Sequence, residues 1–253
     1  MLAEALRVVL RSSAAPTLVV AGRTDAGVHA RAQVCHVDVD PDAWAALPGR
    51  SSRSPAAALL QRLAGALTPE VVVRGAREVP ADFDARFSAL GREYRYLLAD
   101  TAYRPDPLLR TQVAWMRGPL DAAAMQRATP PLLGEHDFVA FCRPRARAST
   151  IRTLRLLDVR RRDELVGVQV EADAFCHHQV RALVGALVAV GAGRRPEGWP
   201  ADVLASKRRD GAVAVAPARG LTLMSVTYPP DEELRARAEQ ARRRRDAPAG
   251  DRS

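Results

Sequence analysis

The chain has 253 residues, a formal net charge of +9 and a sequence pI near 10.5. This length suits one large domain or two closely packed smaller ones, and the positive charge favours a polyanionic partner such as nucleic acid. Nearly all of the positive charge is arginine, because Lys207 is the only lysine. Arginine suits contacts with phosphates and bases, but a GC-rich genome would produce the same bias.

Cysteine usage and apolar runs argue against several classes of protein. The three cysteines, Cys35, Cys142 and Cys176, are widely separated and odd in number, so neither a disulfide framework nor a paired-cysteine zinc motif is predicted. The N-terminus lacks the pattern of a secretory signal. The longest apolar stretch, residues 183–193, is shorter than the about 20 residues that cross a bilayer. We therefore expect a soluble, cytoplasmic protein with no membrane partner.

The first half of the chain alternates short helices and strands. Apolar residues at helical spacing predict helices, and β-branched or alternating runs predict strands. Tyr94, Tyr96 and Leu98 fall on one face of such a strand. Helices are predicted over 2–11 and 56–67, one helical turn within 41–55, and strands over 18–21, 33–39, 71–79 and 92–98.

The second half repeats this pattern. Helices are predicted over 121–129, 178–190 and 199–206, a hairpin over 151–159 and 165–172, and a last strand over 221–228. The recurrence predicts an α+β fold of two related subdomains, each with a mostly antiparallel sheet flanked by helices. We place the subdomains at residues 1–120 and 121–230. Residues 231–253 are predicted to form a charged tail, a frayed helix that becomes disordered.

Residues 22–30, GRTDAGVHA, form the most distinctive segment. It is a polar loop, bracketed by glycines, that follows a buried strand, and such loops often hold reactive side chains on a rigid support. An arginine near Asp25 would keep this carboxylate ionised, and an ionised aspartate can act as a nucleophile. An ordinary turn explains the Asp and Gly residues equally well.

The nonapeptide resembles the signature of the tRNA pseudouridine synthase A family, in which its aspartate is the catalytic nucleophile. Five blocks in the family's order, spread over residues 17 to 228, are far more specific than a single short motif. The other four are FDARFS at 83–88 with REYRY at 92–96, LGEHDFVAF at 133–141, AFCHHQVR at 174–181 and APARGLTL at 216–223.

The resemblance implies an enzyme that isomerises uridine to pseudouridine at positions 38, 39 and 40 of the tRNA anticodon stem-loop. It also implies ferredoxin- or RRM-like halves with the active-site cleft between them, a homodimer, and a reaction that uses neither cofactor nor metal. The target nucleotide must be flipped into a pocket, because a stacked uridine hides its reacting atoms. Asp25 would then attack either ribose C1′ or uracil C6.

The same resemblance assigns three substrate-binding residues. Arg181 matches the arginine that pairs with the nucleophile and keeps it ionised; without the motif it could be a surface arginine on a helix. Arg23 matches an arginine that contacts phosphates or fills the gap left by the flipped base. Tyr94 matches the tyrosine that packs against the uracil, although a tyrosine on a half-buried strand could equally be a core residue.

The histidines suggest a metal cluster only superficially. Adjacent side chains on a strand or helix point in different directions, and no regular ligand spacing links the three candidate groups, so no metal site is predicted. His29, inside the signature, is expected to brace the loop by hydrogen bonds. The candidate groups are Cys35 with His36, His136 with Asp137, and Cys176 with His177 and His178.

The chain also departs from the family pattern. The family's opening strand, with a Tyr-Asp-Gly turn and a Trp-Gln pair, would precede Met1, and its loss would leave unpaired backbone and exposed apolar surface. Gln179 also replaces a common apolar residue, which is a minor change. The alternative function is therefore a non-catalytic RNA- or tRNA-binding protein, or an inactive truncated remnant of the family.

Overall fold

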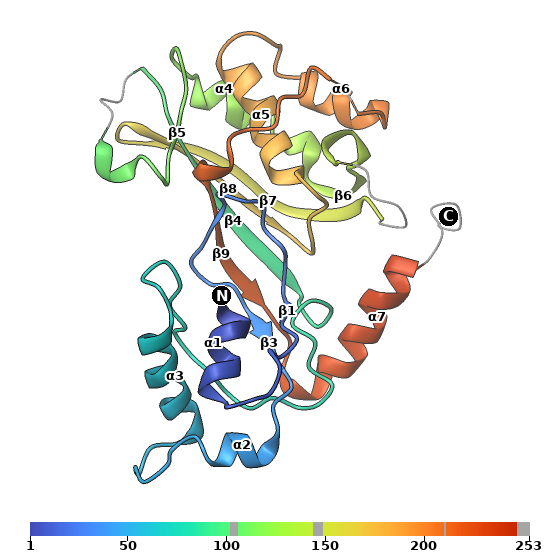
Figure 1. Cartoon of the computed structure of the whole chain (residues 1–253). Coiled ribbons are helices and arrows are strands. Elements are labelled where there is room, and N and C mark those ends of the chain that lie inside the picture. Colours follow the sequence, from blue (N-terminus) through green and yellow to red (C-terminus); the bar gives the residue numbers. More distant parts are fainter. Residues whose placement is uncertain (102–105, 144–148, 210, 247–253) are drawn as a thin grey trace.

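The computed structural model describes residues 1–101, 106–143, 149–209 and 211–246 (Figure 1). Its main feature is a seven-stranded sheet with the order β2-β9-β4-β8-β7-β6, in which β5 also pairs with β4. The β2–β9 and β4–β5 pairs are parallel and the others antiparallel. The predicted α+β class with a mostly antiparallel sheet is confirmed. The strands are β2 (His29–Ala30), β4 (Gly91–Ala99), β5 (Ala114–Trp115), β6 (Gly134–Asp137), β7 (Ile151–Arg162), β8 (Leu165–Ala172) and β9 (Leu221–Thr227).

A smaller unit lies at one end of the long strands (Figure 1). Here β1 (Val19–Val20) and β3 (Cys35–His36) form an antiparallel pair. Three helices accompany them: α1 (Leu2–Val9), α2 (Pro41–Ala45) and α3 (Pro55–Ala66). Side chains of α1 and α3 bury a hydrophobic cluster that is separate from the core of the large sheet.

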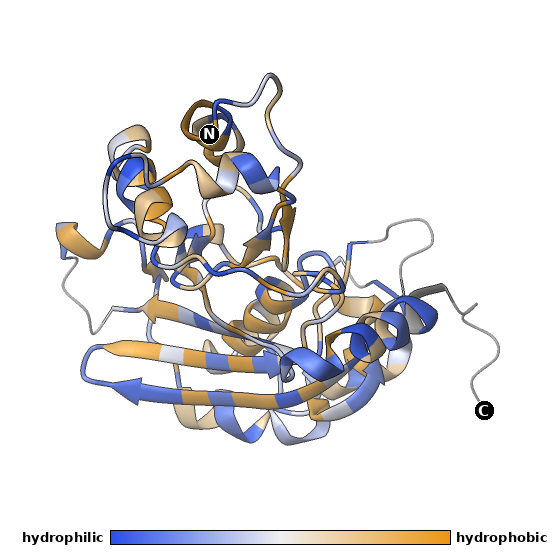
Figure 2. Ribbon diagram, turned by 90° about the horizontal axis from the view of Figure 1, so that it is seen from below, coloured by the Kyte–Doolittle hydropathy of each residue, from blue (hydrophilic) through white to orange (hydrophobic). Residues whose placement is uncertain are grey.

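The main core lies between the large sheet and the helices α4 (Ala122–Arg127), α5 (Gln179–Gly191) and α6 (Trp199–Ser206). Figure 2 shows hydrophobic and hydrophilic residues alternating along the strands, which is expected for a sheet with one buried face. By contrast, α5 is buried almost all round. Its Gly185 lies so close to the loop before η4 (Ala218–Gly220) that a Cβ atom would overlap the carbonyl oxygen of Ala214.

The charged C-terminal segment begins with η5 (Asp231–Glu233) and α7 (Leu234–Asp246). Leu234 is fully buried, Arg237 donates hydrogen bonds to the carbonyl of Ala89, and Arg242 lies 2.8 Å from the Asp84 carboxylate. The helix is therefore attached to the body of the protein. Residues 247–253, the end of the predicted tail, lie outside the described residues.

Most predicted elements are present, several of them with bounds that differ by a few residues. The helices over 2–11, 56–67, 121–129, 178–190 and 199–206 are confirmed, as are the hairpin β7–β8, the strand β4 and the final strand β9. The strand predicted over 71–79 is wrong. This extended segment packs Val73 and Ala76 on the smaller hydrophobic cluster without pairing with a neighbouring strand.

Two further expectations concern cysteines and domain limits. Cys142 and Cys176 are paired as a disulfide with Cα atoms 5.8 Å apart, a pairing that could not be read from the sequence. The 34 residues that separate them in the chain gave no indication that they lie close together.

The division at residue 120 stays a prediction. Strand β4, which lies on the N-terminal side of that division, pairs in the centre of the large sheet. The remaining short helices are η1 (Pro107–Leu109), η2 (Pro130–Leu132) and η3 (Val139–Phe141).

Within the described ranges, the apolar helices are all too short to cross a membrane.

Candidate active site

A cavity of about 1210 Å³ lies where the 22–25 loop, β4 and the start of α5 meet. Three acidic residues line it, Asp25, Glu135 and Asp173. They are outnumbered by arginines, so the cavity is electropositive and suited to a polyanion. The eight lining arginines are Arg23, Arg86, Arg92, Arg143, Arg152, Arg181, Arg237 and Arg243.

Asp25 lies in the turn between β1 and β2. The N–H of Val28 donates to the Asp25 carbonyl at 3.1 Å, and Gly27 has φ +82°, which favours glycine. The ring of His29 hydrogen-bonds the backbone carbonyl of Thr111, so His29 braces the loop as expected. The Asp25 side chain is 22% exposed, which leaves its carboxylate accessible from the cavity.

Arg181, in the first turn of α5, holds the Asp25 carboxylate. Its Nη1 donates to Oδ2 of Asp25 at 2.6 Å, and its Nε donates to the carbonyl of Ala216 at 2.7 Å. The N–H of Ala216 in turn donates to the Arg181 carbonyl at 3.0 Å. The guanidinium is therefore fixed from two sides, and a charge-assisted bond of this length is among the stronger hydrogen bonds in proteins.

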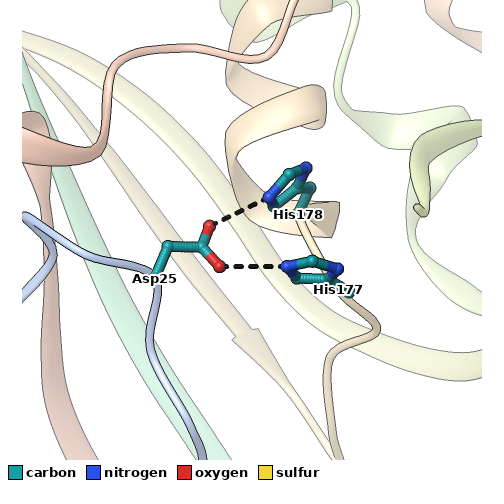
Figure 3. A group of neighbouring side chains, drawn as sticks. All are labelled: Asp25, His177 and His178. Atoms are coloured by element: carbon teal, nitrogen blue, oxygen red, sulfur yellow. Dashed lines mark hydrogen bonds and ion pairs between the residues drawn. The ribbon is translucent and has the colours of Figure 1, made fainter. Parts of the chain in front are cut away.

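Two adjacent histidines complete the surroundings of Asp25 (Figure 3). Nε2 of His177 lies 3.2 Å from Oδ1 of Asp25, and Nε2 of His178 lies 3.4 Å from Oδ2. Both rings point the same way because His178, the N-cap of α5, has a left-handed backbone with φ +70°. The expectation that adjacent histidine side chains point in different directions is therefore wrong here. It assumes a regular helix or strand, and the left-handed backbone of His178 turns the two side chains toward the same side.

The charges around Asp25 determine its ionisation. Burial alone would raise the pKa of Asp25, but the Arg181 hydrogen bond, the protonated form of His178, the charge of Arg181 and the protonated form of His177 bring that pKa below its ordinary value. Burial lowers the pKa of His178, even though Asp25 opposes this, so at neutral pH His178 is mostly uncharged. The permanent charge of Arg181 is thus the main reason that Asp25 stays a carboxylate.

Tyr94 lines the same cavity from β4. Only 8% of the residue is exposed, and its ring meets the edge of the Phe175 ring at a centroid distance of 5.2 Å. Burial, with a smaller contribution from Asp25, raises the pKa of Tyr94 to about 12. The phenol is therefore neutral, and Tyr94 with Phe175 offers an aromatic wall beside the carboxylate.

The structure thus brings together Asp25, Tyr94 and Arg181 around one cavity, whereas Arg23 lies exposed at its border. Among the described residues, no hydrogen bond or ion pair involves Arg23, so it is available to a ligand. His177 and His178 were not predicted as partners of Asp25. Both lie in the AFCHHQVR block, from which only Arg181 was assigned a role, because the turn of the backbone at His178 is not visible in the sequence.

Among the described residues, the side chains of Asp25, His177 and His178 form a group that could hold a metal ion. One ligand atom each from Asp25, His177 and His178 lies within 4.8 Å of the others. The histidine groups around His36 and His136 do not join them: the His36 ring accepts from the N–H of Ala85, and the His136 ring bonds the Leu133 carbonyl.

Comparison with known proteins supports the resemblance. Residues 128–229 match a family model described as tRNA pseudouridine synthase. The chain is 55% identical over 227 residues to tRNA pseudouridine synthase A of Frankia casuarinae, an alignment that covers 89% of this chain and 78% of the relative. It is 51% identical over 248 residues to the same enzyme of Streptomyces griseus, covering 97% and 84%. The Mycobacterium leprae enzyme is 44% identical over 242 residues, covering 93% and 82%.

Proposed function

Because the chain belongs to the tRNA pseudouridine synthase A family, a family of isomerases, we propose that it modifies uridines 38, 39 and 40 of the tRNA anticodon stem-loop with Asp25 as the nucleophile. The observation that carries this proposal is the 2.6 Å bond between Asp25 and Arg181 at the cavity. It combines an ionised, accessible carboxylate with a fixed orientation, as a covalent catalyst requires.

The reaction moves the ribose from N1 to C5 of the same uracil. In one route an Asp25 oxygen bonds C1′ while the N1–C1′ bond breaks and its electron pair stays on the uracil. The uracil turns, C5 bonds C1′ as the Asp25 oxygen leaves, and the C5 proton is lost while N1 is protonated. In the other route an Asp25 oxygen adds to C6 and the C5–C6 double-bond electrons move toward C5 and O4. The N1–C1′ bond then breaks with its electron pair on N1, and C5 bonds C1′. Loss of the C5 proton expels the Asp25 oxygen from C6 and restores the double bond, while N1 is protonated. Both are isomerisations without net oxidation or hydrolysis, so the carboxylate is regenerated.

The other residues support the binding of a flipped nucleotide. Tyr94 and Phe175 give an aromatic wall on which a base can stack. Arg23 is exposed beside the nucleophile, where it can contact a phosphate or occupy the space that the flipped base leaves in the stem-loop. The arginines of the cavity supply the sequence-independent attraction for RNA.

The assembly and location are also proposals. We infer from the family resemblance that the enzyme is a homodimer in the cytoplasm, acting on tRNA there. Sedimentation equilibrium of the purified chain tests the dimer: a mass near 27.4 kDa at micromolar concentration would contradict it.

The primary experiment measures tritium release from C5-labelled uridine in unmodified tRNA. The parent chain should release tritium and the Asp25→Asn variant should not, while both bind tRNA with similar affinity. Transcripts that keep uridine at only one of positions 38, 39 and 40 test the site of modification. Binding without release by a folded parent chain would favour the alternative, a non-catalytic RNA-binding protein.

A further inference from the structure

Asp25, His177 and His178 form a compact cluster with mixed oxygen and nitrogen donors (Figure 3). The carboxylate comes from the loop after β1, and both imidazoles come from the start of α5. The two rings are tilted by 46° with centroids 4.0 Å apart. Both rings present Nε2 toward the same carboxylate. The hydrogen bond between Arg181 and Asp25 does not by itself explain this orientation of the two rings.

The donors lie close enough together for a zinc-class ion to draw them into its coordination shell. Ligand atoms about 2.0–2.1 Å from a tetrahedral ion lie about 3.3–3.4 Å from one another. In this site Nε2 of His177 lies 3.2 Å from Oδ1 of Asp25 and Nε2 of His178 lies 3.4 Å from Oδ2, and one ligand atom from each of the three residues lies within 4.8 Å of the other two. Two histidines and a carboxylate are also a common zinc donor set, and a fourth position, toward the cavity, is left for water. An ion bound here would draw the three side chains closer together than they lie without it.

Two neighbouring features determine how tightly the ion is held. Zinc-binding histidines of resident sites usually donate their second ring N–H to a protein partner, but Nδ1 of His177 is buried without a hydrogen-bond partner among the described residues. Arg181 also places a positive charge at 2.6 Å from the carboxylate. Both weaken the site, so it suits an exchangeable ion rather than a permanent structural one.

We propose that Asp25, His177 and His178 bind an exchangeable zinc-class divalent ion, and that the bound ion inhibits the enzyme by occupying the carboxylate that attacks the substrate. The binding half stands on the geometry of the cluster alone. The inhibition half rests on the proposed role of Asp25 as the nucleophile.

Cobalt(II) tests the binding half, because its visible absorption bands report histidine and carboxylate coordination. The full chain, freed of metal with EDTA and desalted, should bind one Co²⁺ with tetrahedral-type bands that Zn²⁺ abolishes. His177→Ala and His178→Ala should each weaken binding at least tenfold, whereas His136→Ala, outside the cluster, should not change it. Circular dichroism confirms that each variant is folded. Absence of the bands in the parent, or binding by both histidine variants as tight as the parent's, would overturn the site.

The inhibition half is tested by tritium release from tRNA during the same Co²⁺ titration. Activity should fall in proportion to occupancy read from the absorption bands, and EDTA should restore it. Full activity at saturated absorption bands would overturn inhibition while leaving binding intact. A parent chain that releases no tritium in EDTA would instead contradict the proposed function, whatever the cobalt result.

Discussion

Arg181 donates from Nη1 to Oδ2 of Asp25 at 2.6 Å although 156 residues separate them in the chain. The bond joins the first turn of α5 to the loop after β1, and so joins the second half of the chain to the first. The position of Asp25, the proposed nucleophile, therefore depends on how α5 packs against the large sheet.

Replacing Arg181 should move the acid limb of the pH–rate profile. As the proposed nucleophile, Asp25 must be ionised; burial raises its pKa, and the Arg181 hydrogen bond is the largest of the influences that lower it. In Arg181→Ala the Asp25 pKa rises, so the limb moves to higher pH, and the rate at neutral pH falls by roughly 100-fold. Arg181→Lys, which keeps the charge, should shift the limb less. Single-turnover tritium release across pH gives both values.

The matched control for this series is Arg160→Ala. Arg160 is an exposed arginine of the β7–β8 hairpin, paired with Asp158 at 2.8 Å. Its loss should leave the profile unchanged. An acid limb at the parent's position in Arg181→Ala would show that Arg181 does not control the ionisation of Asp25.

The two parts of Tyr94 can be separated by paired substitutions. Tyr94→Phe keeps the ring against Phe175 and should bind tRNA as the parent does, so any loss of rate measures the hydroxyl. Tyr94→Ala removes the stacking wall and a buried ring, and should also lower the free energy of unfolding by about 3 kcal/mol. Rate, affinity and urea unfolding distinguish the outcomes. A Tyr94→Ala enzyme as active as Tyr94→Phe would remove the stacking role.

The ionisation of the Tyr94 phenol leads to a prediction about the rate at high pH. Because burial raises its pKa to about 12, this group stays protonated through the working range. Any alkaline limb of the rate below about pH 11 should therefore persist unchanged in Tyr94→Phe. An alkaline limb that disappears in that variant would assign the limb to Tyr94.

Affinity for tRNA should fall steeply as salt rises, because arginines that bind phosphates release counterions. The log–log slope should decrease by about one in Arg23→Ala, with little dependence on the sequence of the stem-loop. Filter binding at several salt concentrations measures the slope. A slope equal to the parent's would place Arg23 away from the phosphates.

Asp84 gives a prediction about stability. Burial raises the pKa of its carboxyl, but hydrogen bonds from the N–H groups of Phe87 and Arg86 and from Arg242 lower it overall. A lowered carboxyl pKa stabilises the fold above the unfolded value of about 3.9, and this contribution is lost as the pH falls through the lower folded value. Asp84→Asn should therefore lose about 1–2 kcal/mol at pH 7, and the difference from the parent should vanish in acid.

The partner of Asp84 should contribute less. Arg242 is half exposed, so Arg242→Ala should cost less than about 1 kcal/mol in urea unfolding at neutral pH. A loss in Arg242→Ala as large as that in Asp84→Asn would mean that the ion pair, and not the two backbone donors, accounts for the effect.

Sequence patterns predicted those helices and strands in which buried residues recur at a regular spacing along the chain. The apolar spacing of α5 and the alternation of Tyr94, Tyr96 and Leu98 in β4 reflect contact with one core, and both predictions are confirmed. Residues 71–79 have the composition of a strand, but pairing needs a neighbour with free backbone groups, and composition does not show whether one is present.

The site was predictable only in part. Motifs indicated Asp25, Tyr94 and Arg181, and the fold places all three around one cavity. The convergence of His177 and His178 depends on the left-handed backbone of one residue, which no side-chain pattern signals. The Cys142–Cys176 pair likewise depends on how two distant segments pack.

Gly185 lies one helical turn after Arg181, pressed against the backbone of Ala214. A methyl group there would force α5 away from that segment, and a displacement of about 1 Å at a catalytic contact can reduce a rate about 100-fold. The distance between the Arg181 guanidinium and the Asp25 carboxylate thus depends on a residue that has no side chain. An alanine at this position would replace no functional side chain and yet move Arg181 away from Asp25. The geometry of the site therefore depends on the absence of a side chain at residue 185.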